Sequence, residues 1–143
     1  ATKIFIDRAM DIHSSITVVE NFFNITYIRN KGAAFGFLAE SSFRLPFFIL
    51  ISIIAAVVII GIFRKLRPEQ KLTAVSLSLI FAGALGNLID RIRLREVIDF
   101  LDAHWYEHHW PSFNVADSAI CVGVFLLAID MLRDEQRKKS AKS

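Results

Sequence analysis

The sequence predicts a single-domain, all-α integral membrane protein with a small β-structure on the outer face of the membrane. Apolar residues make up 54% of the 143 residues and charged residues 22%, whereas soluble domains average about 45–50% and about 25%. Three long segments nearly exclude charge, and another segment is rich in β-branched and aromatic residues. With a single cysteine, the chain has no disulfide framework.

The charge-poor segments are 45–63, 72–89 and 113–132. A helix needs about 20 mostly apolar residues to cross the hydrocarbon layer, and at this length only a helix satisfies its backbone in lipid. The third segment is interrupted by Asp117 and Asp130. We therefore expect three transmembrane helices; three buried helices of a soluble core are the less favoured alternative.

Basic residues are concentrated on one side of these spans. Segments 64–71 and 133–143 hold nine Lys and Arg in 19 positions, against eight in the other 67 flanking positions. The first side is therefore expected to face the cytoplasm. The net charge of +3 is a topology signal, and no nucleic-acid partner is expected. Three spans place the two termini on opposite faces of the membrane, and segment 1–12 is too short to cross it. We therefore expect that the protein begins upstream of residue 1.

The outer side contains two distinct segments. Segment 16–38 is rich in β-branched and aromatic residues and has turn signals at 20–21 and 30–32, which predicts short strands. Segment 90–112 is predicted to be a mixed loop with an apolar patch, 97–101, around one carboxylate.

Asp117 is the first candidate functional residue. It lies four residues inside the third span, near the outer boundary, and an ionisable group in a span indicates function. Asn114, three residues before it, shares its helix face and could orient the carboxylate. The alternative is an interfacial cap whose carboxylate reaches water.

A second carboxylate could come from Asp90, Asp99 or Asp102 in the outer loop. Asp99 has apolar neighbours on both sides, which disfavours its charged form. Two carboxylates sharing a proton, one activating water and the other protonating the carbonyl, can hydrolyse a peptide. Sequence spacing leaves open which carboxylates meet.

Gly83, Asn87 and Asp90 follow i, i+4, i+7 spacing on the second span. This face combines close backbone approach with a polar network at its outer end. A glycine packing seam with an end-of-helix pair of Asp90 and Arg91 is the alternative reading.

Three further readings stay open. A non-enzymatic ion or proton pathway would also use intramembrane Asp residues with Asn partners. A zinc peptidase would use the H-x-x-x-H spacing of His104 and His108 with His109, although ordinary interfacial histidines are favoured. Cys121 reads as an inert small apolar residue.

Four blocks of the sequence resemble the motifs of the bacterial lipoprotein signal peptidase family, signal peptidase II. They are NKGAAFGFL (30–38), GALGNLIDR (83–91), VIDF (97–100) and FNVADSA (113–119), in the order of that family. The resemblance implies a four-helix transmembrane bundle with a small extracytoplasmic β-cradle. Only residues 1–3 match the end of the block on the family's first helix, so most of that helix is expected to lie outside this sequence.

The resemblance also implies the roles of individual residues. Asp99 and Asp117 correspond to the catalytic pair of an intramembrane aspartic endopeptidase. Residues expected to bind substrate or support this pair are Asn30, Asn87, Asp90, Arg91, Asn114, Ala116 and Lys3. No metal and no organic cofactor is implied.

The implied substrate is a diacylglyceryl-modified prolipoprotein, cut on the N-terminal side of the lipidated cysteine. The implied location is the bacterial inner membrane, with the site near the periplasmic face. The lipid bilayer is the expected surrounding, the peptide antibiotic globomycin the expected inhibitor, and a monomer the expected state.

Overall fold

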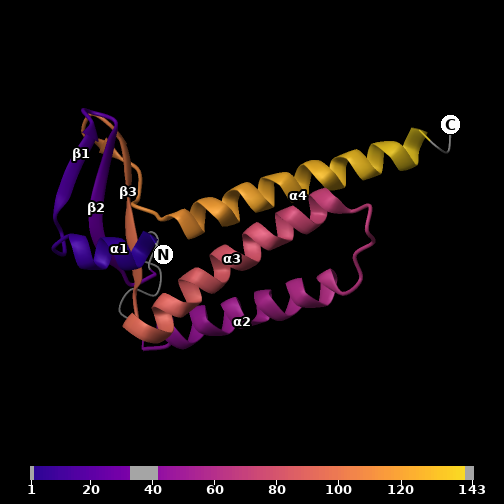
Figure 1. Cartoon of the computed structure of the whole chain (residues 1–143), viewed down its shortest axis with the longest axis horizontal. Coiled ribbons are helices and arrows are strands. Elements are labelled where there is room, and N and C mark those ends of the chain that lie inside the picture. The colour runs from indigo at the N-terminus through magenta and orange to yellow at the C-terminus, as the bar shows by residue number, and fades with distance from the viewer. Residues whose placement is uncertain (1, 33–41, 141–143) are drawn as a thin grey trace.

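Three long helices lie side by side with an antiparallel sheet at one end in the computed structural model, which describes residues 2–32 and 42–140 (Figure 1). The sheet has four strands in the order β1-β2-β3-β4. In chain order the elements are α1 (Thr2–Ala9), β1 (Ser15–Val19), β2 (Phe23–Asn30), α2 (Arg44–Phe63), α3 (Lys71–Leu94), β3 (Val97–Trp105), β4 (His108–His109) and α4 (Val115–Ser140).

The three expected spans correspond to α2, α3 and α4, which are long and apolar enough to cross a membrane, with mean hydropathies of 3.0, 1.9 and 2.1. Two of them extend past the predicted ends at 89 and 132, because backbone hydrogen bonding continues where the sequence turns polar. At its other end α4 begins at Val115 rather than 113, since Phe113 pairs with Leu101 of β3.

Glycines allow α3 and α4 to approach closely. A Cβ atom added at Gly83 would lie 2.3 Å from the backbone oxygen of Ala116, and one at Gly123 would lie 2.7 Å from the backbone oxygen of Ser76. Such contacts are typical of membrane helices, whose association depends on van der Waals packing rather than on burial from water. The glycine seam predicted on the second span is therefore a helix interface.

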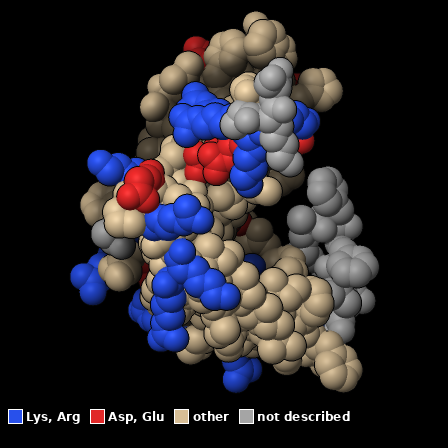
Figure 2. Space-filling view, turned by 90° about the vertical axis from the view of Figure 1, so that its right-hand side faces the viewer, with Lys and Arg blue, Asp and Glu red and all other residues tan. Residues whose placement is uncertain are grey.

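The helix end away from the sheet carries much of the basic charge. Figure 2, viewed along the molecule towards this end, shows Lys and Arg gathered over the α2–α3 connection and the end of α4. The residues there come from the two basic segments, 64–71 and 133–143, as far as they are described. The sheet therefore lies at the opposite end of the helices from this basic end.

The sheet joins two segments that are distant in the sequence. Strands β1 and β2 occupy the predicted region 16–38, except that β1 begins one residue earlier, at Ser15. The expected turn lies between them, and residues 33–38 lie outside the described residues. The prediction of a loop at 90–112 is wrong, because α3 continues to Leu94 and β3 pairs with β2. Residues 97–100 are buried one after another, so β3 lacks the alternation that marks a half-exposed strand.

Helix α1 packs on the sheet instead of crossing a membrane. Ile6 on its buried side joins Tyr27, Ile98 and Phe100 in the apolar cluster beneath it. Because this cluster ties α1 to β2 and β3, it fixes where the neighbouring Lys3 stands relative to the end of α3.

Candidate active site

Asp117 lies in the first turn of α4, which Asn114 caps. The side-chain Oδ1 of Asn114 accepts hydrogen bonds from the backbone N–H groups of Ala116 (2.8 Å) and Asp117 (3.2 Å). In return, the backbone N–H of Asn114 donates to Oδ2 of Asp117 at 3.1 Å. This reciprocal pattern is a capping box, with Asn and Asp in place of the more usual residues. The same local structure thus forms the helix and orients the Asp117 carboxylate.

Asp99 lies in β3 and is 2% exposed. Its two oxygens accept hydrogen bonds from the side-chain amides of Asn114 and Asn30, each at 2.7 Å. Burial, and to a lesser extent the negative charge of Asp117, raise the pKa of Asp99 to about 6 despite the lowering effect of the two amides. Asp99 therefore holds a proton more tightly than an ordinary aspartate does.

Two buried asparagines connect the carboxylates. Nδ2 of Asn114 donates to Oδ1 of Asp99, and Nδ2 of Asn87 donates to Oδ1 of Asp117 at 2.7 Å. Asn114 also donates to Oδ1 of Asn87 at 3.3 Å, which closes the network. Asp99, on a strand, and Asp117, on a helix, are thus linked through one hydrogen-bond network.

Lys3 holds the end of α3 in this network. Its ammonium donates to Oδ1 of Asn87 at 2.6 Å and to Oδ2 of Asp90 at 2.7 Å. The same oxygen of Asp90 accepts the backbone N–H of Ile98 at 3.2 Å, so Asp90 links α1, α3 and β3. These contacts fix the positions of Asn87 and Asp90, and through Asn87 they help to position the carboxylate of Asp117.

Arg91 and Ala116 also lie at the site. The Arg91 guanidinium stacks over the ring of Phe48 at 4.9 Å and is close enough to Asp117 and Asp99 to attract both electrostatically. Ala116 packs against Gly83 at the α3–α4 contact. All nine residues expected from the sequence and the resemblance are therefore at or beside one network.

The structure decides between the three carboxylates that compete for the place beside Asp117. Asp90 is ion-paired with Lys3, and Asp102 accepts from Asn24 and contacts His109. Burial raises the pKa of Asp102, but its hydrogen bonds with His109 and Asn24 outweigh this and hold that pKa below the ordinary value. Asp99, in contrast, is held by amides and has a raised pKa.

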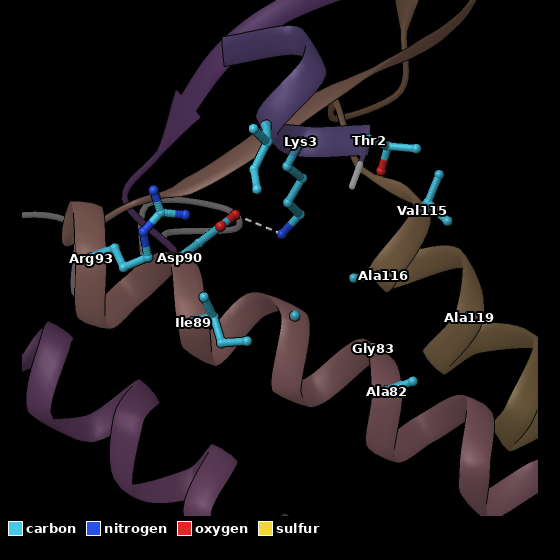
Figure 3. Close-up of a pocket in the computed structure, with 12 residues that line it drawn as sticks. Thr2, Lys3, Ala82, Gly83, Ile89, Asp90, Arg93, Val115, Ala116 and Ala119 are labelled. Carbon is cyan, nitrogen blue, oxygen red and sulfur yellow. Dashed lines mark hydrogen bonds and ion pairs between the residues drawn. The ribbon is translucent and has the colours of Figure 1, made fainter. Parts of the chain in front are cut away.

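A groove of about 340 Å³ opens beside the network between α1, α3 and α4. Figure 3 shows Lys3 reaching Asp90 at one end, while small side chains, Ala82, Ala116 and Ala119, line the other. The lining is mostly apolar, which suits an aliphatic chain or another helix.

Among the described residues, one group of side chains has the donors and spacing of a metal site. It consists of Asp102, His104 and His109, in the β3–β4 hairpin. Asp102 and Asp99 are three residues apart on β3 and so point to opposite faces of the strand. The sequence analysis named His104 and His109 as possible zinc ligands, together with His108, but considered Asp102 only as a possible second catalytic carboxylate.

Comparison with known proteins agrees with this geometry. The family model described as signal peptidase (SPase) II matches residues 1–133. The chain belongs to the signal peptidase II family. It is 66% identical over 138 residues to the lipoprotein signal peptidase of Geobacter sulfurreducens, covering 96% of this chain and 86% of that protein. It is also 40% identical over 142 residues to that of Haemophilus influenzae, covering 99% and 82%.

A solved bacterial membrane enzyme resembles the fold of this family member, with a TM-score of 0.83 and 41% identity over 96% of this chain and 82% of the other. Membership of the signal peptidase II family identifies the chain as a peptidase. The three apolar helices and the matching membrane enzyme identify it as a membrane protein.

Proposed function

We propose that this chain is an aspartic endopeptidase that removes the signal peptide from diacylglyceryl-modified prolipoproteins, cutting before the lipidated cysteine. The observation that carries the proposal is the asparagine-linked pair of Asp99 and Asp117 at the outer end of the spans. Family membership supports the substrate class, because the relatives are lipoprotein signal peptidases.

The raised pKa of Asp99 supports a role for it as the acid and for Asp117 as the base. Asp117 takes a proton from water as the water oxygen bonds to the scissile carbonyl carbon. Asp99 gives its proton to the carbonyl oxygen, which forms a neutral gem-diol. Asp117 then returns a proton to the amine nitrogen as the C–N bond breaks, and the hydroxyl proton goes back to Asp99 as the carbonyl reforms.

The position of the pair suits a substrate that lies partly in lipid. Asp117 stands in the first turn of a span and Asp99 on a strand just outside it, so the scissile bond meets the pair at the outer membrane boundary. The groove of Figure 3 would accept one aliphatic part of the substrate beside the pair. We further propose that, in a bacterium with two membranes, the protein lies in the inner membrane with its site towards the periplasm and acts as a monomer.

The four-helix bundle implied by the resemblance stays a prediction. A stripe of small residues, Ala82, Gly83, Gly86 and Ala119, lines the groove and would let another helix pack closely against α3 and α4.

The test is cleavage of a lipidated signal peptide by Asp99→Asn and Asp117→Asn, with Asp102→Asn as the matched control on the other face of β3. Each of the first two should lose at least about 100-fold in kcat, because each removes one proton-transferring group. The control should stay active, globomycin should block the wild type, and chelators should not. Turnover retained by either pair variant would overturn the assignment; proton flux without cleavage would favour the ion-pathway reading.

A further inference from the structure

The β3–β4 hairpin brings together three potential metal ligands. His104 and His109 face each other across the two strands, and Asp102 lies two residues before His104, on the same face of β3. One ligand atom from each residue lies within 4.8 Å of the other two. Two imidazole nitrogens with a carboxylate oxygen form a ligand set that suits Zn²⁺ and similar divalent ions.

His104 has an unsatisfied buried nitrogen at this point. Its side chain is only 7% exposed, and among the described residues its Nδ1 has no hydrogen-bond partner. The nearest carboxylate oxygen of Asp102 is 3.8 Å away, too far for a hydrogen bond. A buried polar atom without a partner is costly, so a group that occupies this position would be favoured.

The carboxylate of Asp102 is already oriented for such a group. Nδ2 of Asn24 on β2 donates to its Oδ2 at 3.0 Å, while Oδ1 faces Nδ1 of His109 at 2.9 Å. Metal-binding carboxylates are commonly held by a neighbouring donor in this way. Asn24 therefore acts as an orienting residue. Oδ1 is the oxygen that can bind an ion once the ring of His109, which contacts it here, has turned.

His109 is the exposed ligand, and its ring is free to turn where the site opens to solvent. Its side chain is 52% exposed and its ring stacks on that of His104, with centroids 4.5 Å apart and planes differing by 13°. One ion cannot lie in two nearly parallel ring planes, so the exposed ring must turn about its side-chain torsions to bind. Water can complete the coordination from the open side.

We propose that Asp102, His104 and His109 form a binding site for a divalent transition-metal ion of the Zn²⁺ class, which ties β4 to β3. The site is structural, because Asp102 points away from the Asp99 face and lies about 10 Å along the strand from it. Bound metal stabilises the hairpin and takes no part in peptide cleavage.

Tryptophan fluorescence offers a local readout, since the sequence has two tryptophans, Trp105 and Trp110, and both border the site. The full-length protein, in detergent and free of any histidine tag, is titrated with Zn²⁺ by calorimetry and with Co²⁺ by fluorescence quenching. Variants His104→Ala, His109→Ala and Asn24→Ala are compared with His108→Ala and His13→Ala, which alter the remaining histidines.

We expect one Zn²⁺ per chain, a thermal midpoint that rises with Zn²⁺ and falls again with chelator, and quenching by Co²⁺. His104→Ala and His109→Ala should weaken binding more than about tenfold, and Asn24→Ala about tenfold. The two control variants should bind like the wild type, and peptide cleavage at low temperature should not change with chelator.

Absence of saturable binding by the wild type would overturn the proposal. So would wild-type affinity in His109→Ala, whose exposed side chain can be removed without harming the fold, which keeps the test decisive even if His104→Ala unfolds. Binding lost in His108→Ala but kept in His104→Ala would place the ion on surface histidines and overturn the proposal equally.

Discussion

Replacing Asn114 should damage both the fold and the chemistry, because this fully buried residue performs two separable tasks. Its Oδ1 caps α4, and its Nδ2 donates to Asp99. Losing the cap costs about 0.5–2 kcal/mol, and leaving the buried Asp99 oxygen short of a donor costs about 1–3 kcal/mol. We expect Asn114→Ala to lower the free energy of unfolding by about 2–4 kcal/mol.

The two tasks can be separated with Asn114→Ser, which keeps an oxygen for the cap but has no amide to reach Asp99. This variant should recover the cap contribution to stability and still lose roughly 100-fold in kcat, since the carboxyl loses its positioning contact. Asn24→Ala is the matched control, because it removes an amide donor to a carboxylate on the other face of β3.

A pH profile supplies the decisive readout. Asp99 must be protonated to act as the acid, so kcat/KM should fall as pH rises through its pKa of about 6. The Asn114 amide favours the charged form of Asp99, so removing it raises that pKa and moves the alkaline limb to higher pH. If both Asn114 variants leave this limb where it is, or move it to lower pH, the assigned role of Asn114 is refuted.

Three further predictions concern stability. Gly83→Ala should cost about 1–3 kcal/mol, because its new Cβ meets the Ala116 backbone; Gly61→Ala, with no described atom within 4 Å of its added Cβ, should be neutral or stabilising in the same thermal denaturation series. Lys3→Ala should cost about 3–5 kcal/mol by leaving Asp90 buried and unpaired, whereas Lys139→Ala, which breaks an exposed pair, should leave the midpoint unchanged. The pKa of Asp99 is raised from 3.8 to about 6, so the native state holds this proton more tightly than the unfolded state does. The contribution of Asp99 to the free energy of unfolding is therefore fully present below about pH 4 and falls by about 3 kcal/mol as the pH rises to about 6. Asp99→Asn should abolish that slope, and an identical slope in the variant would show that other groups cause it.

Parts of the fold and site that depend on local sequence could be predicted well. The three spans follow from hydropathy alone, and the pairing of Asn114 with Asp117 follows from their spacing at a helix start. Prediction failed at β3, because residues 97–100 are buried in succession and show no strand periodicity. The C-terminal ends of α3 and α4 were also predicted too early in the sequence, since helical hydrogen bonding does not stop where the apolar residues do.

The sequence by itself determined the membrane class and Asp117 as a candidate, and it predicted the orientation, because hydropathy, charge bias and helical spacing act over a few residues. Motif resemblance added Asp99 as its partner. Only the tertiary structure shows which carboxylate joins Asp117 in one network: pairing of β2 with β3 points Asp99 at Asn114, while Lys3 neutralises Asp90 and His109 contacts Asp102. These contacts join residues up to 87 positions apart, and no local pattern records which distant side chains the folded chain will bring together.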